Sequence, residues 1–495
     1  MVVYSVNLGI GYASSGVEYA QSYRHRLFDR LGISHKNIFL DMIDRDSVYS
    51  LCENIGISSK RVIWLYDFFR DERVKESKIT KEILESNYGK ISETRSTKER
   101  IIYGEDVKNY VVANLSKFSD NKVVSAEIVV NGCLVRKDYF SELGVYCSEF
   151  YAPKEGFATL YKRSFFATDG SIYLDELVNG KDSVFNLNDG IIFYSREEFF
   201  KEMMDLLLST LDYVLLDRST GTAKALFELK VSVDFKIGVV VHAEHFVPES
   251  VREGSIIWNN YYDYQIRNSS MVDSFICSTD LQASILKEQI NSYTGRTITT
   301  HTIPVGYIKE KDVDLLERDK RKFITVSRLS EEKNLDLLIK AFSLIKEDYD
   351  FTLDIYGEGG ERTKLEKLIK DLGLEGKVNL VGHKTMNRLY EGYSTYVTAS
   401  KGEGFGLSLL EALGSACFII GFNVNYGNTT FIKNGKTGYL ADYIEFDEES
   451  NIESLATAIR LSLESDSLSR SDCLSLARDY KSEKVLNSWK EFLNA

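Results

Sequence analysis

Between residues 322 and 422 the chain alternates between short apolar runs and longer segments in which apolar residues recur at helical spacing. The runs have the length of strands and read KFITVSRL, FTLDIYGEG, KVNLVGH, TYVTAS and CFIIGF. Strands that alternate with helices pair in parallel, because each crossover helix returns the chain to the same edge of the sheet. The pattern predicts a doubly wound α/β domain of five parallel strands, which binds ligands beyond their carboxyl ends.

The start of the chain shows the same alternation. An apolar run at 2–6 precedes a glycine-containing turn and a helical pattern from about 15 to 30, and further apolar runs lie at 38–40 and 62–66. The alternation resumes after residue 196 with a helical pattern, DYVLLD and KIGVVVHAEH. A chain of 495 residues is too long for one ordinary core. We therefore expect two Rossmann-like domains that face each other across a cleft.

The segment from about 75 to 200 interrupts this pattern. Its apolar residues alternate or bunch in runs such as AEIVVNGCLVRKDYF and VFNLNDGIIFYS. Dipeptides typical of hairpin turns separate the runs: Asn131-Gly132, Asp169-Gly170, Asn179-Gly180 and Asp189-Gly190. Asn-Gly and Asp-Gly favour two-residue turns between antiparallel strands, so we predict an inserted β-meander of roughly six to eight strands.

These patterns divide the chain into four parts. Residues 1–74 and 201–307 form the N-terminal Rossmann-like domain, and residues 75–200 form the inserted β-meander module. The second Rossmann-like domain spans 308–480 and opens with the charged stretch EKDVDLLERDKR. We expect 481–495 to form a helix that crosses back to the first domain.

Charge and cysteine content disfavour several classes of protein. A formal net charge of −13 disfavours a nucleic-acid ligand or a polyanionic acceptor. The six cysteines are scattered without a Cys-x-x-Cys pair, which indicates free thiols in a reducing compartment. The N-terminus lacks a basic signal-peptide region, and no apolar run approaches the roughly 18 residues of a membrane span. We expect a cytoplasmic protein, with peripheral association at the inner face of the membrane as an open alternative.

Residues 398–416 read TASKGEGFGLSLLEALGSA, in which three glycines lie between a strand and a helical pattern. Glycines let a ligand approach the backbone closely, and a helix from about Leu407 presents free N–H groups to an anion such as a diphosphate. Glu403 and Glu411 would then face neutral hydroxyl groups. A nucleotide sugar, which has hydroxyls on both sides of its diphosphate, fits this arrangement. The alternative is a glycine-rich turn with two solvated glutamates.

The stretch SRLSEEKN (327–334) follows an earlier strand of the same domain. Arg328 and Lys333 stand five positions apart at the carboxyl end of that strand. Cations at this edge would neutralise the charge that develops on a departing nucleotide diphosphate, which is the role of Mg²⁺ elsewhere. We see no carboxylate cluster with metal-ligand spacing in the sequence and therefore expect no metal cofactor. The alternative is a solvated, charged helix start.

Together these residues resemble the retaining GT-B glycosyltransferases of family 4, which carry an R-x4-K pair and an E-x7-E motif in their second domain. The resemblance implies that Arg328 and Lys333 bind the diphosphate and that Glu411 binds the ribose hydroxyls. It assigns the donor sugar to His242, Glu403 and the backbone of Gly404, Phe405, Gly406 and Leu407. The catalytic set that it implies is His242, Arg328, Lys333 and Glu403.

The same resemblance assigns further nucleotide contacts. The loop GHKT (382–385) would face the base through His383, Lys384 and Thr385. The glycine loop near the N-terminus would close over the phosphates through Gly16 and Val17, with Glu18 and Tyr19 beside it. One departure is that the family often has a Gly and a Pro after the E-x7-E helix, where this chain has Ala416, Cys417 and Phe418. The shape of that turn therefore stays open.

His242, in VVVHAEHF, ends a predicted strand of the first domain and so lies at the ligand-binding edge. A core or orienting histidine is the alternative. We expect Glu244 and His245, on the same run, to be structural. The aromatic stretch WNNYYDYQ (258–265) is interpreted as core packing, with contact to an acceptor as the alternative.

Several stretches resemble a narrower group more closely, including NLGIGYASSGVEYAQSYR, YCSEFYAP, VVVHAEH, NNYYDYQ and YGNTTFIKNGKTGYL. They are similar to the catalytic subunit of the two-component glycosyltransferase that begins O-glycosylation of serine-rich-repeat adhesins before their export by the accessory Sec system. The resemblance implies transfer of N-acetylglucosamine, or glucose, from a UDP-sugar to Ser/Thr of the adhesin. It also implies a homologous, non-catalytic partner subunit that the β module binds.

Two rival functions share much of this pattern. A wall-teichoic-acid α-glucosyltransferase would act on a polyphosphate chain and so favour a basic β module, whereas residues 75–200 are mixed in charge. The non-catalytic partner subunit would be expected to lack Arg328, Lys333 or one of the two motif glutamates, and all of these are present.

Overall fold

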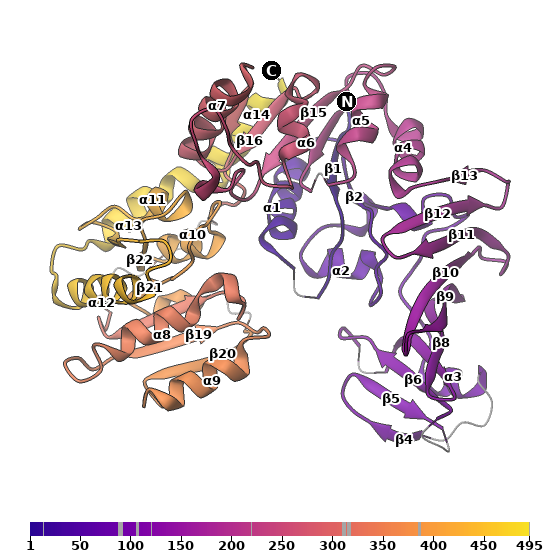
Figure 1. The fold of residues 1–495 in the computed structure, drawn as a ribbon, viewed down its shortest axis with the longest axis horizontal. Helices are drawn as coiled ribbons and strands as arrows, with labels where there is room; N and C mark the ends of the chain where they lie inside the picture. The colour runs from indigo at the N-terminus through magenta and orange to yellow at the C-terminus, as the bar shows by residue number, and fades with distance from the viewer. Residues whose placement is uncertain are drawn as a thin grey trace. The chain divides into compact units, whose positions relative to one another are not determined.

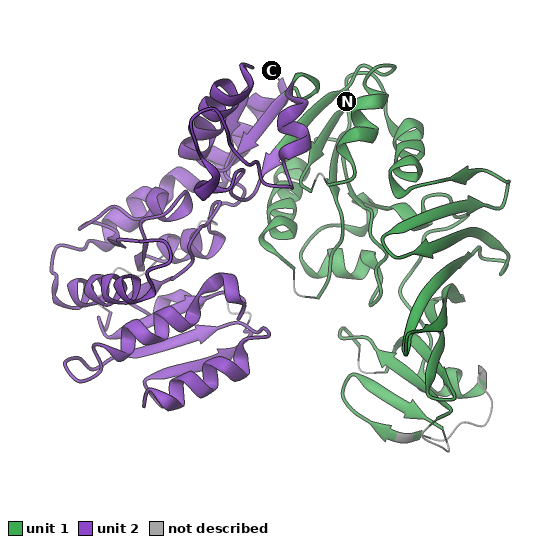
Figure 2. Cartoon of the chain, in the orientation of Figure 1, with its two compact units in different colours: residues 1–239, 270–273 green, residues 240–269, 274–495 purple. Residues whose placement is uncertain are grey.

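The computed structural model describes residues 1–12, 14–87, 93–104, 108–119, 121–218, 220–308, 313, 318–384 and 388–494. The chain divides into two compact units, residues 1–239 with 270–273 and residues 240–269 with 274–495 (Figure 2). The four-part division expected from the sequence uses different boundaries and stays a prediction.

The N-terminal half contains a seven-stranded sheet in the order β17-β16-β15-β14-β1-β2-β3 (Figure 1). Its strands are β1 (Val3–Asn7), β2 (His35–Phe39), β3 (Val62–Trp64), β14 (Tyr213–Leu216), β15 (Lys236–Val241), β16 (Ser274–Cys277) and β17 (Thr300–Thr302). Its helices are α1 (Gly16–Leu31), α2 (Val48–Asn54), α4 (Arg196–Leu207), α5 (Ala223–Leu229), α6 (Asp263–Arg267) and α7 (Asp280–Thr294). β1 pairs in parallel with β2 on one side and with β14 on the other, so the strand order reverses between β1 and β14.

The insertion is a ten-stranded antiparallel sheet in which neighbours in sequence are neighbours in space. Its strands are β4 (Glu93–Ser96), β5 (Arg100–Tyr103), β6 (Tyr110–Leu115), β7 (Val123–Val130), β8 (Cys133–Ser141), β9 (Gly144–Lys154), β10 (Phe157–Phe166), β11 (Ile172–Asn179), β12 (Asp182–Leu187) and β13 (Ile192–Phe193). The predicted meander is confirmed, and Gly132, Gly170, Gly180 and Gly190 all have positive φ between its strands. The predicted number of strands is too low, because β4 and β5 have four residues each and are too short to show alternation.

Both ends of the inserted sheet have apolar cover within the chain. At one end Ile79, Leu84, Val123 and Ala126 belong to one buried cluster that includes α3 (Lys81–Asn87). At the other end the rings of Tyr66 and Phe165 stack at 5.0 Å, and those of Phe185 and Phe199 stack at 4.8 Å. The apolar residues at the start of β7 are therefore covered within the chain.

The C-terminal sheet has six strands in the order β20-β19-β18-β21-β22-β23. These are β18 (Lys322–Val326), β19 (Thr352–Tyr356), β20 (Val378–Gly382), β21 (Thr395–Val397), β22 (Phe418–Phe422) and β23 (Gly438–Ala441), all paired in parallel. The doubly wound prediction is confirmed, with β23 as a sixth strand that the sequence did not reveal. Adjacent residues such as Phe323 and Ile324 enter separate buried clusters, so helices cover both faces of the sheet.

The remaining helices belong to this half: α8 (Leu335–Ser343), α9 (Arg362–Asp371), α10 (Leu407–Gly414), α11 (Gly427–Phe431), α12 (Glu448–Glu464), α13 (Arg470–Ala477) and α14 (Ser482–Asn494). Phe492 of α14 contacts His301 of β17, with ring centroids 4.9 Å apart. Of the helices in the described ranges, none combines the length and apolar content that a bilayer crossing requires. All six cysteines are free thiols, five of them buried, and Cys133 at the β7–β8 hairpin is exposed.

Candidate active site

The R-x4-K and E-x7-E segments meet where the strand order of the C-terminal sheet reverses, between β18 and β21. Lys333 follows β18, and Glu403 follows β21. The Nζ atom of Lys333 lies 2.6 Å from Oε1 of Glu403, and their side chains are 22% and 19% exposed. Parallel sheets bind ligands beyond the carboxyl ends of their strands at such a reversal. The fold thus brings a cation and a carboxylate from distant parts of the chain to the expected ligand edge.

Arg328 takes a different partner. Its Nη2 atom lies 2.9 Å from Oε1 of Glu332, and the two side chains are 58% and 55% exposed. An exposed ion pair of this kind contributes about 1 kcal/mol or less, so an anionic ligand can displace the carboxylate at little cost. Within the described residues, Arg328 pairs with Glu332 and is not brought to the Lys333–Glu403 pair.

Two of the predicted sugar-binding backbone positions require glycine on steric grounds. A Cβ at Gly404 would lie 2.1 Å from the carbonyl oxygen of His242, and Gly406 has a φ of +83°. α10 begins at Leu407, as the sequence predicts. Phe405 is buried against Phe431, with ring centroids 5.2 Å apart, and so anchors the loop in the core.

Glu411, in the second turn of α10, accepts a hydrogen bond of 2.8 Å from the buried hydroxyl of Tyr390. The hydroxyl of Tyr396 lies 2.9 Å from that of Ser408 on the same helix. Burial raises the pKa of both tyrosine hydroxyls, so they stay protonated and can donate. Sequence reasoning missed both residues, although the three-residue tyrosine spacing in YEGYSTY was a signal.

His242 directly follows β15, and side chains from two later segments hold its turn. The amides of His242 and Ala243 donate to the hydroxyl of Tyr262 at 2.9 and 3.2 Å, and Gln282 donates to the Ala243 carbonyl at 3.1 Å. Within the aromatic stretch Trp258 and Tyr262 are buried, whereas Tyr261 and Tyr264 are exposed. The buried pair agrees with core packing, and Tyr262 in addition positions the His242 turn.

The glycine loop of the first unit leads into α1 through a capping box. Ser15 caps the helix, and the Glu18 carboxylate accepts from the Ser15 amide at 2.5 Å and from Asn7 at 3.0 Å. Glu18 is 5% exposed, so the structure uses it to fix the helix start. Gly16 and Tyr19 are exposed and Val17 is half-buried.

Arg218, which sequence reasoning missed, lies just after β14 beside this helix start. Its Nη2 atom donates to Oγ of Ser15 at 3.2 Å. In the second unit, His383 and Lys384 follow β20 and are exposed, whereas the predicted base contact Thr385 lies outside the described residues.

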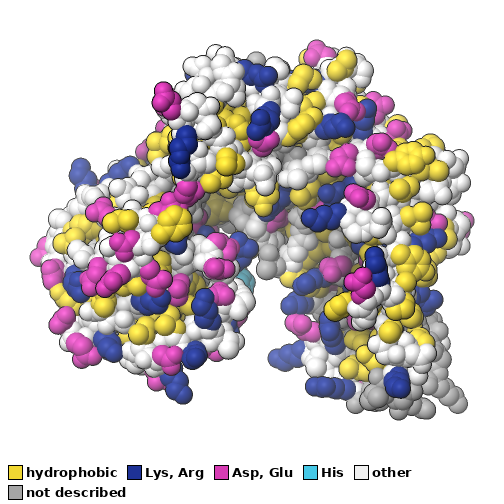
Figure 3. All heavy atoms as spheres, viewed as in Figure 1, with side chains coloured by type: hydrophobic (Ala, Val, Ile, Leu, Met, Phe, Trp, Pro, Cys, Tyr) yellow, Lys and Arg dark blue, Asp and Glu magenta, His cyan; other side chains and the backbone are white. Residues whose placement is uncertain are grey.

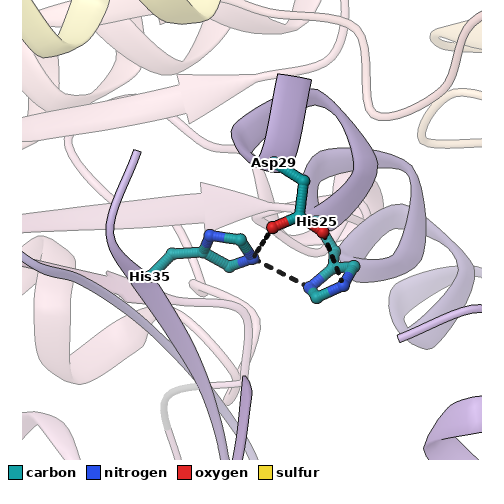
Figure 4. Close-up of side chains that lie close together, drawn as sticks. All are labelled: His25, Asp29 and His35. Carbon is teal, nitrogen blue, oxygen red and sulfur yellow. Dashed lines mark hydrogen bonds and ion pairs between the residues drawn. The ribbon is translucent and has the colours of Figure 1, made fainter. Parts of the chain in front are cut away.

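One group in the described part of the chain has the composition of a metal site: His25, Asp29 and His35 (Figure 4). Nδ1 of His35 donates to a backbone carbonyl at 3.0 Å, which leaves its Nε2 to accept from Nδ1 of His25 at 2.8 Å. Nε2 of His25 in turn accepts the Ser58 amide at 3.1 Å. Burial lowers the pKa of both histidines, to about 4 for His25. All four ring nitrogens have protein partners, and the group fits a neutral histidine pair better than a cation site.

The fold and the site define a GT-B glycosyltransferase. Residues 308–478 match the family described as glycosyl transferases group 1, and residues 92–189 match the GtfA extended beta-sheet domain.

Full-length comparisons narrow the class. The chain is 40% identical over 499 residues to the UDP-N-acetylglucosamine--peptide N-acetylglucosaminyltransferase GtfA subunit of Streptococcus pneumoniae serotype 4, across 99% of this chain and 98% of that protein. The solved structure of the pneumococcal O-GlcNAc transferase GtfA in complex with UDP and GlcNAc matches with a TM-score of 0.90 at 38% identity, covering 100% of this chain and 98% of that chain. A GtfA/B complex structure matches with a TM-score of 0.83 at 37% identity, covering 100% and 99%. The chain belongs to the family of GtfA subunits.

Proposed function

We propose that this chain is the catalytic subunit of a transferase that moves N-acetylglucosamine from UDP to Ser/Thr hydroxyls of a polypeptide and retains the anomeric configuration. The observation that carries the proposal is the Lys333–Glu403 pair at the strand-order reversal of the C-terminal sheet. The proposal is also supported by the similarity of this chain to a GtfA subunit over almost the full length of both proteins. Glucose is the alternative donor sugar.

In the proposed reaction Lys333 and Arg328 bind the diphosphate, and Glu411 binds the ribose. Glu403 and His242 hold the sugar. The acceptor hydroxyl attacks the anomeric carbon from the face that the diphosphate leaves. The bond from that carbon to the diphosphate oxygen breaks, and the departing phosphate oxygen takes the acceptor proton. Two cations offset the charge that builds on UDP, so we expect no metal requirement.

The inserted sheet is the proposed docking surface for a homologous, non-catalytic glycosyltransferase subunit. Figure 3 shows hydrophobic side chains on the visible face over the inserted sheet. On neighbouring strands β10 and β11, Phe157, Tyr161 and Leu177 are 77%, 48% and 51% exposed. Large exposed apolar side chains mark interaction surfaces, and the related GtfA/B complex supports a partner of the same class.

The proposed acceptor is the Ser/Thr-rich repeat of an adhesin, modified before its export. The reaction then takes place in the cytoplasm, at or near the inner face of the membrane. A wall-teichoic-acid glucosyltransferase is the second candidate, and the net charge of −13 disfavours its polyanionic acceptor. The complete R-x4-K and E-x7-E motifs disfavour a non-catalytic role for this chain.

The test incubates the full chain, with and without a candidate partner subunit, with radiolabelled UDP-GlcNAc or UDP-glucose in EDTA. A Ser/Thr-rich polypeptide and a teichoic-acid polymer are offered as acceptors. We expect α-linked N-acetylglucosamine on the polypeptide, with the linkage read by NMR. A β-linked product, or activity only with added Mg²⁺, would contradict the mechanism. Labelling of the polymer alone would favour the second candidate.

The docking surface has a separate test. Phe157→Asp together with Tyr161→Asp is expected to abolish co-purification with the partner and to lower transfer much more than donor hydrolysis, since water needs no docking surface. Ile444→Asp, at a residue 53% exposed in the C-terminal half, is the control. Partner binding that survives the double substitution would show that the contact lies elsewhere.

A further inference from the structure

Three segments of the second unit meet backbone to backbone beside the proposed sugar site: 242–245, 403–405 and 425–427. Glycines allow this approach, since a Cβ at Gly404 would lie 2.1 Å from the His242 carbonyl oxygen and one at Gly427 would lie 2.1 Å from that of Phe405. Backbones packed this closely leave no room for a side chain between the segments.

Hydrogen bonds tie the second and third segments together. The amides of Tyr426 and Gly427 both donate to the Glu403 carbonyl oxygen, at 2.9 and 2.8 Å. The Glu403 amide donates in return to the carbonyl of Asn425 at 3.2 Å. The backbone of Tyr426 therefore fixes the residue whose side chain meets Lys333.

The side chain of Tyr426 reaches the first segment. Its hydroxyl donates to the carboxylate of Glu244 and lies 3.4 Å from Nδ1 of His245. Tyr426 is 1% exposed, and its ring stacks on His245 with the planes 21° apart. Nε2 of His245 donates to Gln289 at 2.8 Å, which leaves Nδ1 as the unprotonated nitrogen. Two acceptors, a carboxylate and an imidazole, thus face one phenol proton.

We propose that Tyr426 and Glu244 are a positioning pair that sets His242 against Glu403 at the donor sugar, and this inference rests on the function proposed above. Glu244 stands two residues after His242, and Tyr426 holds the backbone of Glu403. Their side-chain hydrogen bond closes a ring that runs through both sugar-contacting residues. Neither residue belongs to the R-x4-K or E-x7-E motif.

The hydrogen bond between Tyr426 and Glu244 is expected to depend on pH. Burial raises the pKa of Glu244 to about 7 and lowers that of His245 to about 4. The titratable groups that face the Glu244 carboxyl are His245 and the Tyr426 phenol, whose pKa burial raises further, so Glu244 alone of the three changes charge near neutral pH. An ionised carboxylate accepts the stronger hydrogen bond. We expect the wild-type rate to fall as pH drops below about 7.

Tyr426→Phe and Glu244→Ala are each expected to lower kcat for donor hydrolysis and for peptide transfer by about 10-fold to 100-fold, since small displacements of reacting groups have effects of this size. The Kd for UDP, whose contacts lie elsewhere, is expected to stay within about twofold. The double variant is expected to be no slower than the slower single variant, because either change breaks the same bond.

Tyr349→Phe is the matched control. It removes an exposed hydrogen bond from the half-buried Tyr349 to Glu464 on α12 and is expected to leave kcat unchanged. Glu244→Gln keeps a neutral acceptor for Tyr426 and does not titrate, so we expect a kcat at pH 8 between those of the wild type and Glu244→Ala, with no fall in rate below pH 7.

Additive losses in the double variant, or wild-type kcat in a folded Tyr426→Phe protein, would overturn the positioning pair. Equal weakening of UDP binding and of kcat would show a general structural role instead. A wild-type chain that hydrolyses a UDP-sugar but labels no polypeptide would contradict the proposed function. In that case the kcat for donor hydrolysis alone tests the positioning role of Tyr426 and Glu244.

Discussion

The two parallel sheets each reverse strand order once, between β18 and β21 and between β1 and β14, yet they use polar residues there differently. At the C-terminal reversal, Lys333 and Glu403 form a pair that keeps about a fifth of its surface exposed. At the N-terminal reversal, a closed network of side chains, each at most 5% exposed, bonds internally: Asn7, Glu18, Gln21, Arg24 and Asp217. Equivalent positions thus hold the residues of the proposed ligand site in one sheet and fix the start of a helix in the other.

The largest effect on stability is expected from a substitution in the buried network at the N-terminal reversal. Asp217→Ala removes the carboxylate that accepts two hydrogen bonds from Arg24 and leaves a buried guanidinium without its counter-charge. We expect a loss of about 3–5 kcal/mol in the free energy of unfolding, measured in urea. Asp263→Ala, which breaks a more exposed pair with Arg267, is the control and should cost less than about 1 kcal/mol. A loss that small in Asp217→Ala would show that the network does not hold α1.

The next largest effect is expected from two residues of the proposed donor site, Lys333 and Glu411. Lys333→Ala and Glu411→Ala are each expected to lower transfer by about 10²–10³-fold, the usual effect of losing a positioned electrostatic group. Circular dichroism should show an intact fold, since both act at a ligand edge. Lys340→Ala removes an exposed pair with Glu448 on the same half and should keep the wild-type rate. A variant that retains more than about a tenth of that rate has been wrongly assigned to the donor site.

Ionisation of Glu244 is expected to have opposite effects on the catalytic rate and on stability. The rate should rise as Glu244 loses its proton, whereas its contribution to stability should fall. Its folded pKa of about 7 lies above the ordinary value of 4.5, so its contribution to stability is present below pH 4.5 and lost as pH rises through 7. The difference corresponds to at most about 3 kcal/mol. Glu244→Gln should therefore raise stability at pH 8 and leave it unchanged near pH 4, as followed by thermal unfolding. Destabilisation at pH 8 would contradict the sign.

The smallest expected effect, on the free energy of unfolding, comes from a comparison of the turns that follow α1 and α10. The residue after α1 is Gly32, with a φ of +67°, whereas the turn after α10 places Ala416 at +56°. The departure of this chain from the family pattern at 416 thus leaves the left-handed turn in place, with strain on the alanine. Ala416→Gly is expected to raise the free energy of unfolding by roughly 0.5 kcal/mol, the relief of strain less the entropy of glycine. A loss above about 1 kcal/mol would show that the buried methyl group matters more.

Local periodicity was enough to predict both parallel sheets, and turn dipeptides located four hairpins of the insertion. The same signals missed β4, β5 and β23, because a strand of four residues carries too little pattern. Motif spacing indicated the sheet edge at which Lys333 and Glu403 form their ion pair, and their role in donor binding stays a prediction. It could not show that the Glu18 carboxylate caps the start of α1, nor that Tyr426 donates a hydrogen bond to Glu244, 182 residues away. Side-chain partnerships across such separations depend on packing that no local pattern encodes.

The distribution of the cysteines gives the chain a built-in labelling site. Burial raises the pKa of Cys52, Cys147, Cys277 and Cys473, which withholds the reactive thiolate, whereas Cys133 sits at an exposed hairpin tip. A maleimide dye added to the native protein should therefore couple at one position, and mass spectrometry after digestion would identify it. The fluorophore would then report from the proposed docking module without any change to the amino-acid sequence.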